Sequence, residues 1–206
     1  MDNLLELLLK NMRRPLPGLS AHHEMSPLKR PSGDFPERAQ ARSSAVAVVI
    51  SEFSKVPSII LTQRHEYDGV HSGQISFPGG KKEENDPDLE FTARRECMEE
   101  IGIDLASASL IGSLTEVYIP VSKFIVQPYL YLKEDQIELN LNEREVREII
   151  HFPVHELLSH ENRSTMDVRS REGVIYRNIP CFKTGNKEIW GATALILNEL
   201  RILLSS

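Results

Sequence analysis

The sequence has 206 residues, of which 40% are apolar and 26% are charged, a composition typical of a globular domain large enough for a real core. Its formal charge of −6 argues against general nucleic-acid binding, which normally needs a basic surface. It still allows a phosphorylated small molecule, provided that positive charge or a metal ion gathers locally. The two cysteines, Cys97 and Cys181, fit no disulfide framework and no metal-ligand spacing, so we expect a reducing, cytoplasmic setting.

The first 14 residues are rich in leucine, with Leu4, Leu5, Leu8 and Leu9 at helical spacing. This spacing predicts a short amphipathic helix docked on the body of the protein, with a membrane-surface helix as the alternative. The basic residues follow the leucines, which is the opposite order to a signal peptide. No other window approaches the ~18 apolar residues of a membrane-spanning helix, so we expect a soluble protein.

Residues 15–42 are rich in Pro, Gly, Ser and charge and show little periodicity. This composition predicts an extended arm that wraps around the domain, with His22 and His23 on a solvated surface. We therefore divide the chain into an N-terminal helix and arm, residues 1–43, and a folded domain, residues 44–206.

Strand patterns outnumber helical patterns in the rest of the chain. Apolar, β-branched runs bounded by turn residues predict strands over residues 44–51, 58–63, 74–77, 109–119, 124–132 and 149–152, and a hairpin over 166–178 that turns at Glu172–Gly173. Helical spacing predicts a helix that starts at Asp86-Pro87-Asp88 and stops at Gly102, a short helix over 154–159 and a final helix over 192–204. The order predicts an α/β (α+β) fold with a mixed sheet flanked by helices.

Three glutamates lie close together on the predicted helix before Gly102. At ~100° per residue, Glu99 and Glu100 lie about 60° and about 40° to either side of Glu96, on a face opposite the apolar stripe of the helix. Arg95 is four residues before Glu99 and can pair with it. Three clustered carboxylates suit a hard cation such as Mg²⁺ or Mn²⁺. The alternative is a solvated face, although lysines would usually be interspersed there.

The residues around these glutamates resemble the Nudix box. Its usual form is Gly, five residues, Glu, seven residues, and then Arg-Glu-aliphatic-x-Glu-Glu-x-Gly-aliphatic. Residues 95–103, RECMEEIGI, match the second half, with Cys97 at the first aliphatic position. The first half departs from the form, because Gly80 is followed by Asp86 instead of Glu, and eight residues rather than seven precede Arg95.

The longer loop and the upstream residues are similar to the coenzyme A pyrophosphatase subfamily of Nudix hydrolases. The signature of that subfamily is Leu-Thr-x-Arg, then His-x-Gly, then Phe-Pro-Gly-Gly. This chain reads LTQRHEYDGVHSGQISFPGGK over residues 61–81, and the likeness continues to about Leu204. The resemblance implies a Nudix-like α/β/α sandwich and a metal-dependent hydrolase that cleaves the pyrophosphate bond of coenzyme A or acyl-coenzyme A, giving adenosine 3′,5′-bisphosphate and 4′-(acyl)phosphopantetheine.

The resemblance also implies roles for individual residues. Glu96, Glu99 and Glu100 would hold Mg²⁺ or Mn²⁺, and Glu96, Glu99 and Arg95 belong to the catalytic set. Glu145 is our candidate for a general base, with a salt bridge to a neighbouring arginine as the alternative. The candidate substrate-binding residues are Arg64, His71, Gly79, Gly80 and Lys81. The two glycines would form a tight turn near the helix, and Lys81 would supply positive charge.

Several of these residues have simpler explanations. Arg64 fits an exposed strand position as well as a phosphate contact, and His71 fits a structural turn as well as a substrate contact. Cys97 lies on the apolar stripe, so we expect no nucleophilic role. We expect a small nucleotide as the partner, no nucleic acid or membrane partner, and a monomer or homodimer.

Two other functions remain open at this point. One is a Nudix hydrolase that acts on ADP-ribose, NADH or another nucleoside diphosphate derivative. The other is a non-catalytic nucleotide-binding module, which would have no need of three metal-binding carboxylates.

Overall fold

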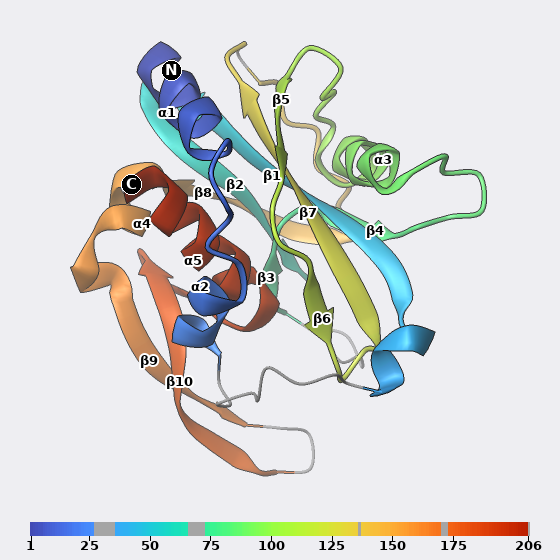
Figure 1. Ribbon diagram of the computed structural model, residues 1–206, viewed down its shortest axis with the longest axis vertical. Coiled ribbons are helices and arrows are strands. Elements are labelled where there is room, and N and C mark those ends of the chain that lie inside the picture. The colour runs from blue at the N-terminus through green and yellow to red at the C-terminus, as the bar shows by residue number, and fades with distance from the viewer. Residues whose placement is uncertain (27–35, 66–72, 136, 170–172, 206) are drawn as a thin grey trace.

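A single mixed sheet forms the centre of the protein (Figure 1). The computed structural model describes residues 1–26, 36–65, 73–135, 137–169 and 173–205. Within these residues the main sheet has eight strands, and its longest path runs β3-β2-β1-β7-β5. Its strands are β1 (Arg42–Phe53), β2 (Val56–Arg64), β3 (Ile75–Ser76), β4 (Gly79–Lys81), β5 (Ser109–Ser113), β6 (Val117–Ile119), β7 (Phe124–Lys133) and β8 (Val146–Pro153).

The central pair of strands, β1 and β7, runs parallel, whereas the other pairs of this sheet are antiparallel. Antiparallel β8 extends β2, β4 pairs with the first half of β1, and β6 pairs with β7. The predicted mixed sheet is therefore confirmed. Because β1 and β7 are parallel, the chain between them must cross over the sheet, and it does so with α3 (Leu89–Ile101).

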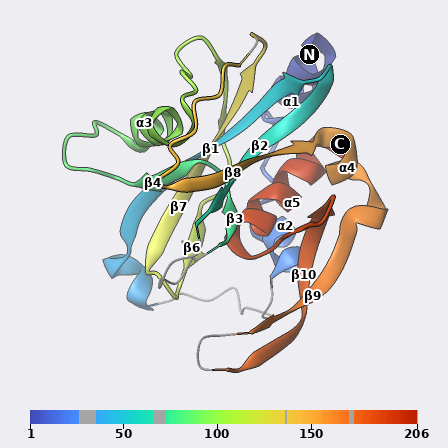
Figure 2. The same cartoon turned by 180° about the vertical axis from the view of Figure 1, so that it is seen from behind.

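Both faces of β1 are buried, which explains its continuous apolar sequence. Ala45, Ala47 and Val49 pack with the apolar residues of α3, while Val48 and Ile50 belong to the core beneath α5 (Gly191–Ser205). Figures 1 and 2 show α3 on one side of the sheet and α5, with its neighbouring helices, on the other. The protein is thus a layered helix–sheet–helix structure, as the sequence predicts.

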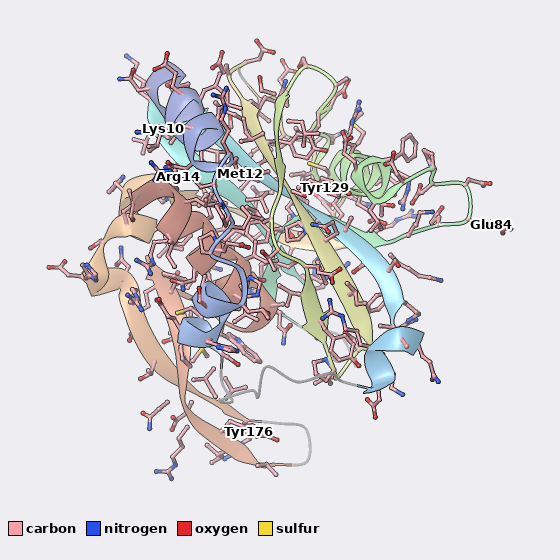
Figure 3. All side chains as sticks on the ribbon, viewed as in Figure 1. Lys10, Met12, Arg14, Glu84, Tyr129 and Tyr176 are labelled. Carbon is pink, nitrogen blue, oxygen red and sulfur yellow. The ribbon has the colours of Figure 1, made fainter. Side chains whose placement is uncertain are left out.

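The α5 side is covered by short elements from both ends of the chain. Helices α1 (Asp2–Asn11), α2 (Gly18–Met25) and α4 (Val154–Leu158) contact α5. A second, three-stranded sheet consists of β9 (Arg163–Arg169), β10 (Ile175–Thr184) and β11 (Lys187–Ile189). Its β9–β10 hairpin projects away from the main sheet, and Tyr176 marks its outer part in Figure 3. The remaining short elements are the 3₁₀ helices η1 (Pro36–Gln40) and η2 (His160–Asn162).

The N-terminal region differs from the predicted extended arm in its helices and in the burial of His22. Part of it is the helix α2, and His22 is not on a solvated surface but buried at 5% exposure, with its Nε2 atom 3.4 Å from an oxygen of Glu199. Glu199 lies on α5 and is fully buried. The burial of His22 therefore depends on a partner near the other end of the chain.

Glu199 joins three segments by its two carboxylate oxygens. The backbone N–H of Gly18 donates to Oε1 at 3.0 Å, and Thr115 donates its N–H to Oε2 at 3.0 Å and its hydroxyl to Oε1 at 2.7 Å. Burial by itself would raise the pKa of Glu199, but His22, Thr115 and Gly18 together hold this pKa below its ordinary value. The ionised carboxylate thus stabilises the docking of α2 on α5.

We expect Glu199→Gln to lower the free energy of unfolding by about 1–3 kcal/mol at neutral pH, because a buried acceptor of charge-assisted hydrogen bonds is lost. Since the folded pKa of Glu199 is lowered, its contribution is present above the unfolded value of about 4.5 and is lost as the pH falls below it. Urea unfolding at neutral and acid pH measures both effects. The matched control is Glu6→Gln, at an exposed site on α1. If the difference in free energy of unfolding between Glu199→Gln and the wild type were as large in acid as at neutral pH, this account would be wrong.

Candidate active site

The helix α3 carries most of the candidate residues, and local signals define both of its ends. The N-cap Asp88 accepts a hydrogen bond from the N–H of Phe91 at 2.8 Å, which satisfies an otherwise free helical donor. Gly102 ends the helix with φ of 74°, in the left-handed region that favours glycine. The predicted start and stop are therefore confirmed.

The two glycines before α3 form a short strand instead of the predicted tight turn. In β4, Gly79 pairs with Val46 and Gly80 with Ala45 of β1. A Cβ atom on Gly79 would lie 2.4 Å from the Ala45 carbonyl oxygen, and one on Gly80 would lie 2.4 Å from the carboxylate of Glu96. The absence of both side chains allows β4 to lie between β1 and α3. The expected close approach of the backbone to the helix is present, but strand pairing produces it.

Arg95 connects the helix to the segment before it. Its Nε and Nη2 atoms donate to the two oxygens of Asp86 at 3.0 and 2.9 Å, and Nη2 also donates to the carbonyl oxygen of Lys81 at 3.2 Å. Its Nη1 atom donates to Glu96 and Glu99, both at 2.9 Å, so the predicted pairing of Arg95 with Glu99 is confirmed. The guanidinium therefore holds three carboxylates and one backbone carbonyl within one small region.

Asp86 is a site residue whose role the sequence signals did not reveal. It is 3% exposed, and besides Arg95 it accepts hydrogen bonds from the Thr92 hydroxyl and the Glu83 N–H, both at 2.9 Å. The hydrogen bonds from Arg95 hold the pKa of Asp86 far below its ordinary value, against the effect of burial. Its only signal in the sequence is its place in the Nudix box, where a Glu is usual. Here it orients Arg95.

Glu100 lies differently from the prediction. We placed it opposite the apolar stripe, but it is 2% exposed and its carboxylate contacts residues of β2 and β4. Its Oε1 accepts from Arg64 Nη2 at 3.3 Å and its Oε2 from the Gly79 N–H at 3.1 Å. Burial raises the pKa of Glu100 to about 7, although Arg64 and Gly79 act in the opposite direction. Arg64 is thus more than an exposed strand arginine, because its guanidinium pairs with Glu100 and partly neutralises this carboxylate.

Glu145 lies near the helix carboxylates because the loop between β7 and β8 packs on the end of α3. The N–H of Asn140 donates to the Ile101 carbonyl at 3.0 Å, and the N–H of Asn142 donates to the Glu100 carbonyl at 2.9 Å. The Asn142 side chain also donates to Glu145 at 3.3 Å. The negative charge of Glu145 contributes to the raised pKa of Glu100. Nothing in the sequence pointed to Asn142, because its partners lie on a distant element.

The remaining candidates divide into exposed, buried and undescribed residues. Lys81 exposes its side chain and contributes its carbonyl to Arg95, and His71 lies outside the described residues. Cys97 is fully buried, and burial raises the pKa of its thiol well above its ordinary value. A nucleophilic role for Cys97 therefore has no physical support.

The chemistry of this cluster fits a hard divalent cation. The cluster consists of the carboxylates of Glu96, Glu99 and Glu100, and carboxylate oxygens are the ligands that such cations prefer. Burial raises the pKa of Glu96 even beside Arg95, and repulsion from Glu99 and Glu145 adds to this shift. A bound cation would relieve this repulsion. In the part of the chain that the structure describes, no three His, Cys, Asp or Glu side chains are yet gathered in a metal-holding arrangement. The side chains of Glu96 and Glu99 are instead turned toward the same nitrogen of Arg95.

Comparison with known proteins agrees with this geometry. The model of the NUDIX domain matches residues 41–172, which include β1, the glycine strand, α3 and the loop of Glu145. The chain belongs to the Nudix family. Relatives from Yersinia pestis and Yersinia pseudotuberculosis, each named as the uncharacterised Nudix hydrolase NudL, are 34% identical over 144 residues, 70% of this chain and 71% of theirs.

The fold is also similar to a solved structure, the MutT/nudix family protein from Enterococcus faecalis. The TM-score is 0.55 at 16% sequence identity, covering 91% of this chain and 68% of that chain. Family membership and the named relatives make this Nudix protein a hydrolase of pyrophosphate bonds. The alternative of a non-catalytic binding module is set aside. None of the described helices has the length and apolar character needed to cross a membrane.

The two glycines of β4 offer a matched pair of substitutions. We expect Gly79→Ala to destabilise the protein strongly, because the new methyl group meets the backbone of β1, which has no room to move. Gly80→Ala meets only the end of the Glu96 side chain, so we expect a melting temperature close to that of the wild type and a large loss of hydrolysis. Thermal unfolding and activity, measured on both variants, check this separation. Equal unfolding of both variants would show that Gly80 serves packing alone.

Proposed function

We propose that this Nudix hydrolase cleaves the pyrophosphate bond of coenzyme A or an acyl-coenzyme A, giving adenosine 3′,5′-bisphosphate and 4′-(acyl)phosphopantetheine. The observation that carries the proposal is the convergence of the upstream signature on the catalytic helix. Arg64, near its beginning, and Gly79, near its end, bind the two oxygens of the same carboxylate, Glu100. These two contacts support the proposal, because they bring two residues of the upstream signature against one carboxylate of α3.

The acidic cluster supplies the binding groups in this proposal. Glu96, Glu99 and Glu100 would hold Mg²⁺ or Mn²⁺, with Arg95 and Asp86 keeping the carboxylates close together. When bound, such a cation would neutralise the pyrophosphate oxygens, whose charge otherwise repels an incoming nucleophile. Arg64 lies at the edge of this cluster with its side chain 34% exposed, and its guanidinium would suit a phosphate of the substrate.

Glu145 is the residue that we assign as general base. Its side chain is exposed, it is oriented by Asn142, and its charge acts on both Glu96 and Glu100. In the proposed reaction a water oxygen forms a new bond to one phosphorus while Glu145 accepts a water proton. The bond from that phosphorus to the bridging oxygen breaks, and the bridging oxygen leaves with the other half of the substrate.

The raised pKa of Glu100 makes the proposed cation binding depend on pH. Because a protonated carboxyl group is a poor ligand, we expect Mn²⁺ affinity to rise about tenfold per pH unit from about pH 6 and to level off above the Glu100 pKa of about 7. Titration of Mn²⁺ followed by electron paramagnetic resonance measures this. Glu100→Gln should bind more weakly and lose most of the pH dependence. A flat profile for the wild type would remove Glu100 from the ligand set.

The substrate is tested by incubating the protein separately with coenzyme A, ADP-ribose and NADH, with Mg²⁺, with Mn²⁺ or with a chelator, and identifying the products by mass spectrometry. We expect metal-dependent release of 4′-phosphopantetheine, faster than any product from the other two compounds. Glu99→Gln should lower this rate on the order of 10²- to 10³-fold, because charge stabilisation at the phosphates is lost. Faster cleavage of ADP-ribose or NADH would retain the hydrolase and overturn the coenzyme A assignment.

Glu84→Gln is the matched control for this experiment. Glu84 lies on the loop between β4 and α3, exposed and at the outer edge of the molecule in Figure 3. The substitution removes one negative charge from the same part of the chain without touching the cluster. We expect its rate to equal that of the wild type. A comparable loss in both variants would indicate a general charge effect rather than a role of Glu99.

A further inference from the structure

A pocket lies on the α3 side of the sheet, next to the β1–β2 hairpin and apart from the acidic cluster. It encloses about 400 Å³, which is within the range of small-molecule sites. Its walls are mainly apolar, and Glu52 is the charged residue among those that line it. The described residues that line it are Ser51, Glu52, Phe53, Ser54, Ile60, Ile137, Leu139 and His151. None of these residues belongs to the acidic cluster. Ile60 is four residues before Arg64 on β2, which corresponds to about 13 Å along the strand.

Two buried polar atoms of this pocket have no partner among the described residues. Ser51 is 4% exposed, and its hydroxyl oxygen makes no hydrogen bond. The Nδ1 atom of His151 is also buried and unpaired. Leaving such groups unsatisfied costs on the order of 1–3 kcal/mol each, so a molecule that binds both would recover this free energy.

The strand next to Ser51 provides a direct contrast. Ser58 is the cross-strand neighbour of Ser51 and is equally buried, but its hydroxyl donates to the Val56 carbonyl at 3.1 Å. A buried serine hydroxyl at this position in the sheet can therefore donate a hydrogen bond to a nearby backbone carbonyl. Ser51 does not, and it is the one of the two that lines the pocket.

An aromatic surface adjoins the two unpaired atoms. The ring of Phe53 stacks on the ring of His151, with the centroids 3.7 Å apart and the planes 11° apart. Phe53 is 49% exposed, so part of its side chain remains open to a further flat molecule. Burial lowers the pKa of His151, which keeps its ring neutral and able to donate one hydrogen bond and accept another.

The charge of the lining narrows the class of ligand. No lysine or arginine occurs among the described residues that line the pocket, and Glu52 stands at its exposed rim. An anion would therefore be repelled and would find no counter-charge. A neutral molecule with one or two aromatic rings and one hydrogen-bonding group matches the stacking surface and the two polar atoms together.

The loop that covers the pocket also reaches the acidic cluster. Ile137 and Leu139 line the pocket, and Asn140 and Asn142 follow directly with their hydrogen bonds to the end of α3. The fit of Asn140 is tight, because a Cβ atom on Gly102 would lie 2.7 Å from its side chain. A bound molecule that displaces Ile137 or Leu139 would therefore also move the tightly packed residues that follow them, up to Glu145.

We propose that this pocket is a second ligand site, for a neutral aromatic molecule with one hydrogen-bonding group, and that its occupation alters hydrolysis through residues 137–145. The binding part is independent of the proposed substrate. The effect on hydrolysis rests on the proposed function. It can be measured with any pyrophosphate substrate that the wild type cleaves.

Binding is tested with phenol, indole and benzimidazole as probes, and with benzoate as an anionic probe, on the intact protein at slightly alkaline pH. Amide chemical shifts in NMR spectra locate and quantify binding at millimolar concentrations. We expect at least one neutral probe to shift the residues around Ser51 and His151, and benzoate to shift none of them. Absence of binding by all three neutral probes would overturn the site.

Ser51→Ala and Ser58→Ala form the matched pair of variants. Ser51→Ala removes an unpaired hydroxyl, so we expect no loss of melting temperature and about 5- to 10-fold weaker probe binding. Ser58→Ala removes a satisfied hydroxyl outside the pocket, so we expect a melting temperature lower by about 2–4 °C and unchanged probe binding. Equal affinity in the wild type and Ser51→Ala would contradict the role of the hydroxyl.

The rate part is measured as kcat/KM for the substrate, with and without the bound probe. We expect a change of about twofold or more in the wild type and in Ser58→Ala, and a smaller change in Ser51→Ala at the same probe concentration. An unchanged kcat/KM at full occupation would overturn the connection to the active site while leaving the binding site intact. A protein that cleaves none of the tested pyrophosphates would refute the proposed function without affecting the binding result.

Discussion

The close packing of β4 between β1 and α3 is the constraint on which the candidate active site depends. Two glycines make it possible, because side chains at Gly79 and Gly80 would overlap the β1 backbone and Glu96. Because the two elements lie so close, main-chain groups of β4 bond to side chains of α3. The Gly79 N–H donates a hydrogen bond to Glu100, and the Lys81 carbonyl accepts one from Arg95. Hydrogen bonds between the main chain of β4 and the side chains of Glu100 and Arg95 thus connect α3 to the sheet.

The same packing concentrates negative charge more than stability alone would favour. Burial raises the pKa of Glu100 to about 7 and also raises that of Glu96, while Arg95 and Arg64 only partly compensate. Like charges held at short range destabilise the folded state, and such strain is typical of sites organised for binding. Arg95 holds three of the carboxylates close together, and the proposed cation would neutralise part of their charge.

The two sides of the sheet differ in the residues that they carry. On the α5 side, helices from both ends of the chain form a continuous apolar core, and the fully buried Glu199 ties α2 and the loop before β6 to α5. None of the described residues that we assign to the reaction lies on that side. The α3 side carries the acidic cluster and, at the other end of β2, the pocket of Ser51 and His151. The α5 side is therefore occupied by the apolar core, and the residues that we propose for function lie on the α3 side.

The sequence by itself determined the features that depend on near neighbours in the chain. The limits of α3, its Arg95–Glu99 pair and most strands followed from caps, four-residue spacing and apolar runs, and the arrangement of glutamates in the Nudix box indicated the chemistry. Only the tertiary structure decided the burial of His22 and Glu100, the strand formed by Gly79 and Gly80, and the place of Asn142 beside α3. Each of these depends on a partner from a distant segment, Glu199, β2, β1 and α3 respectively. Local spacing carries no information about such partners, because the burial and pairing of a residue are set by the elements that fold against it.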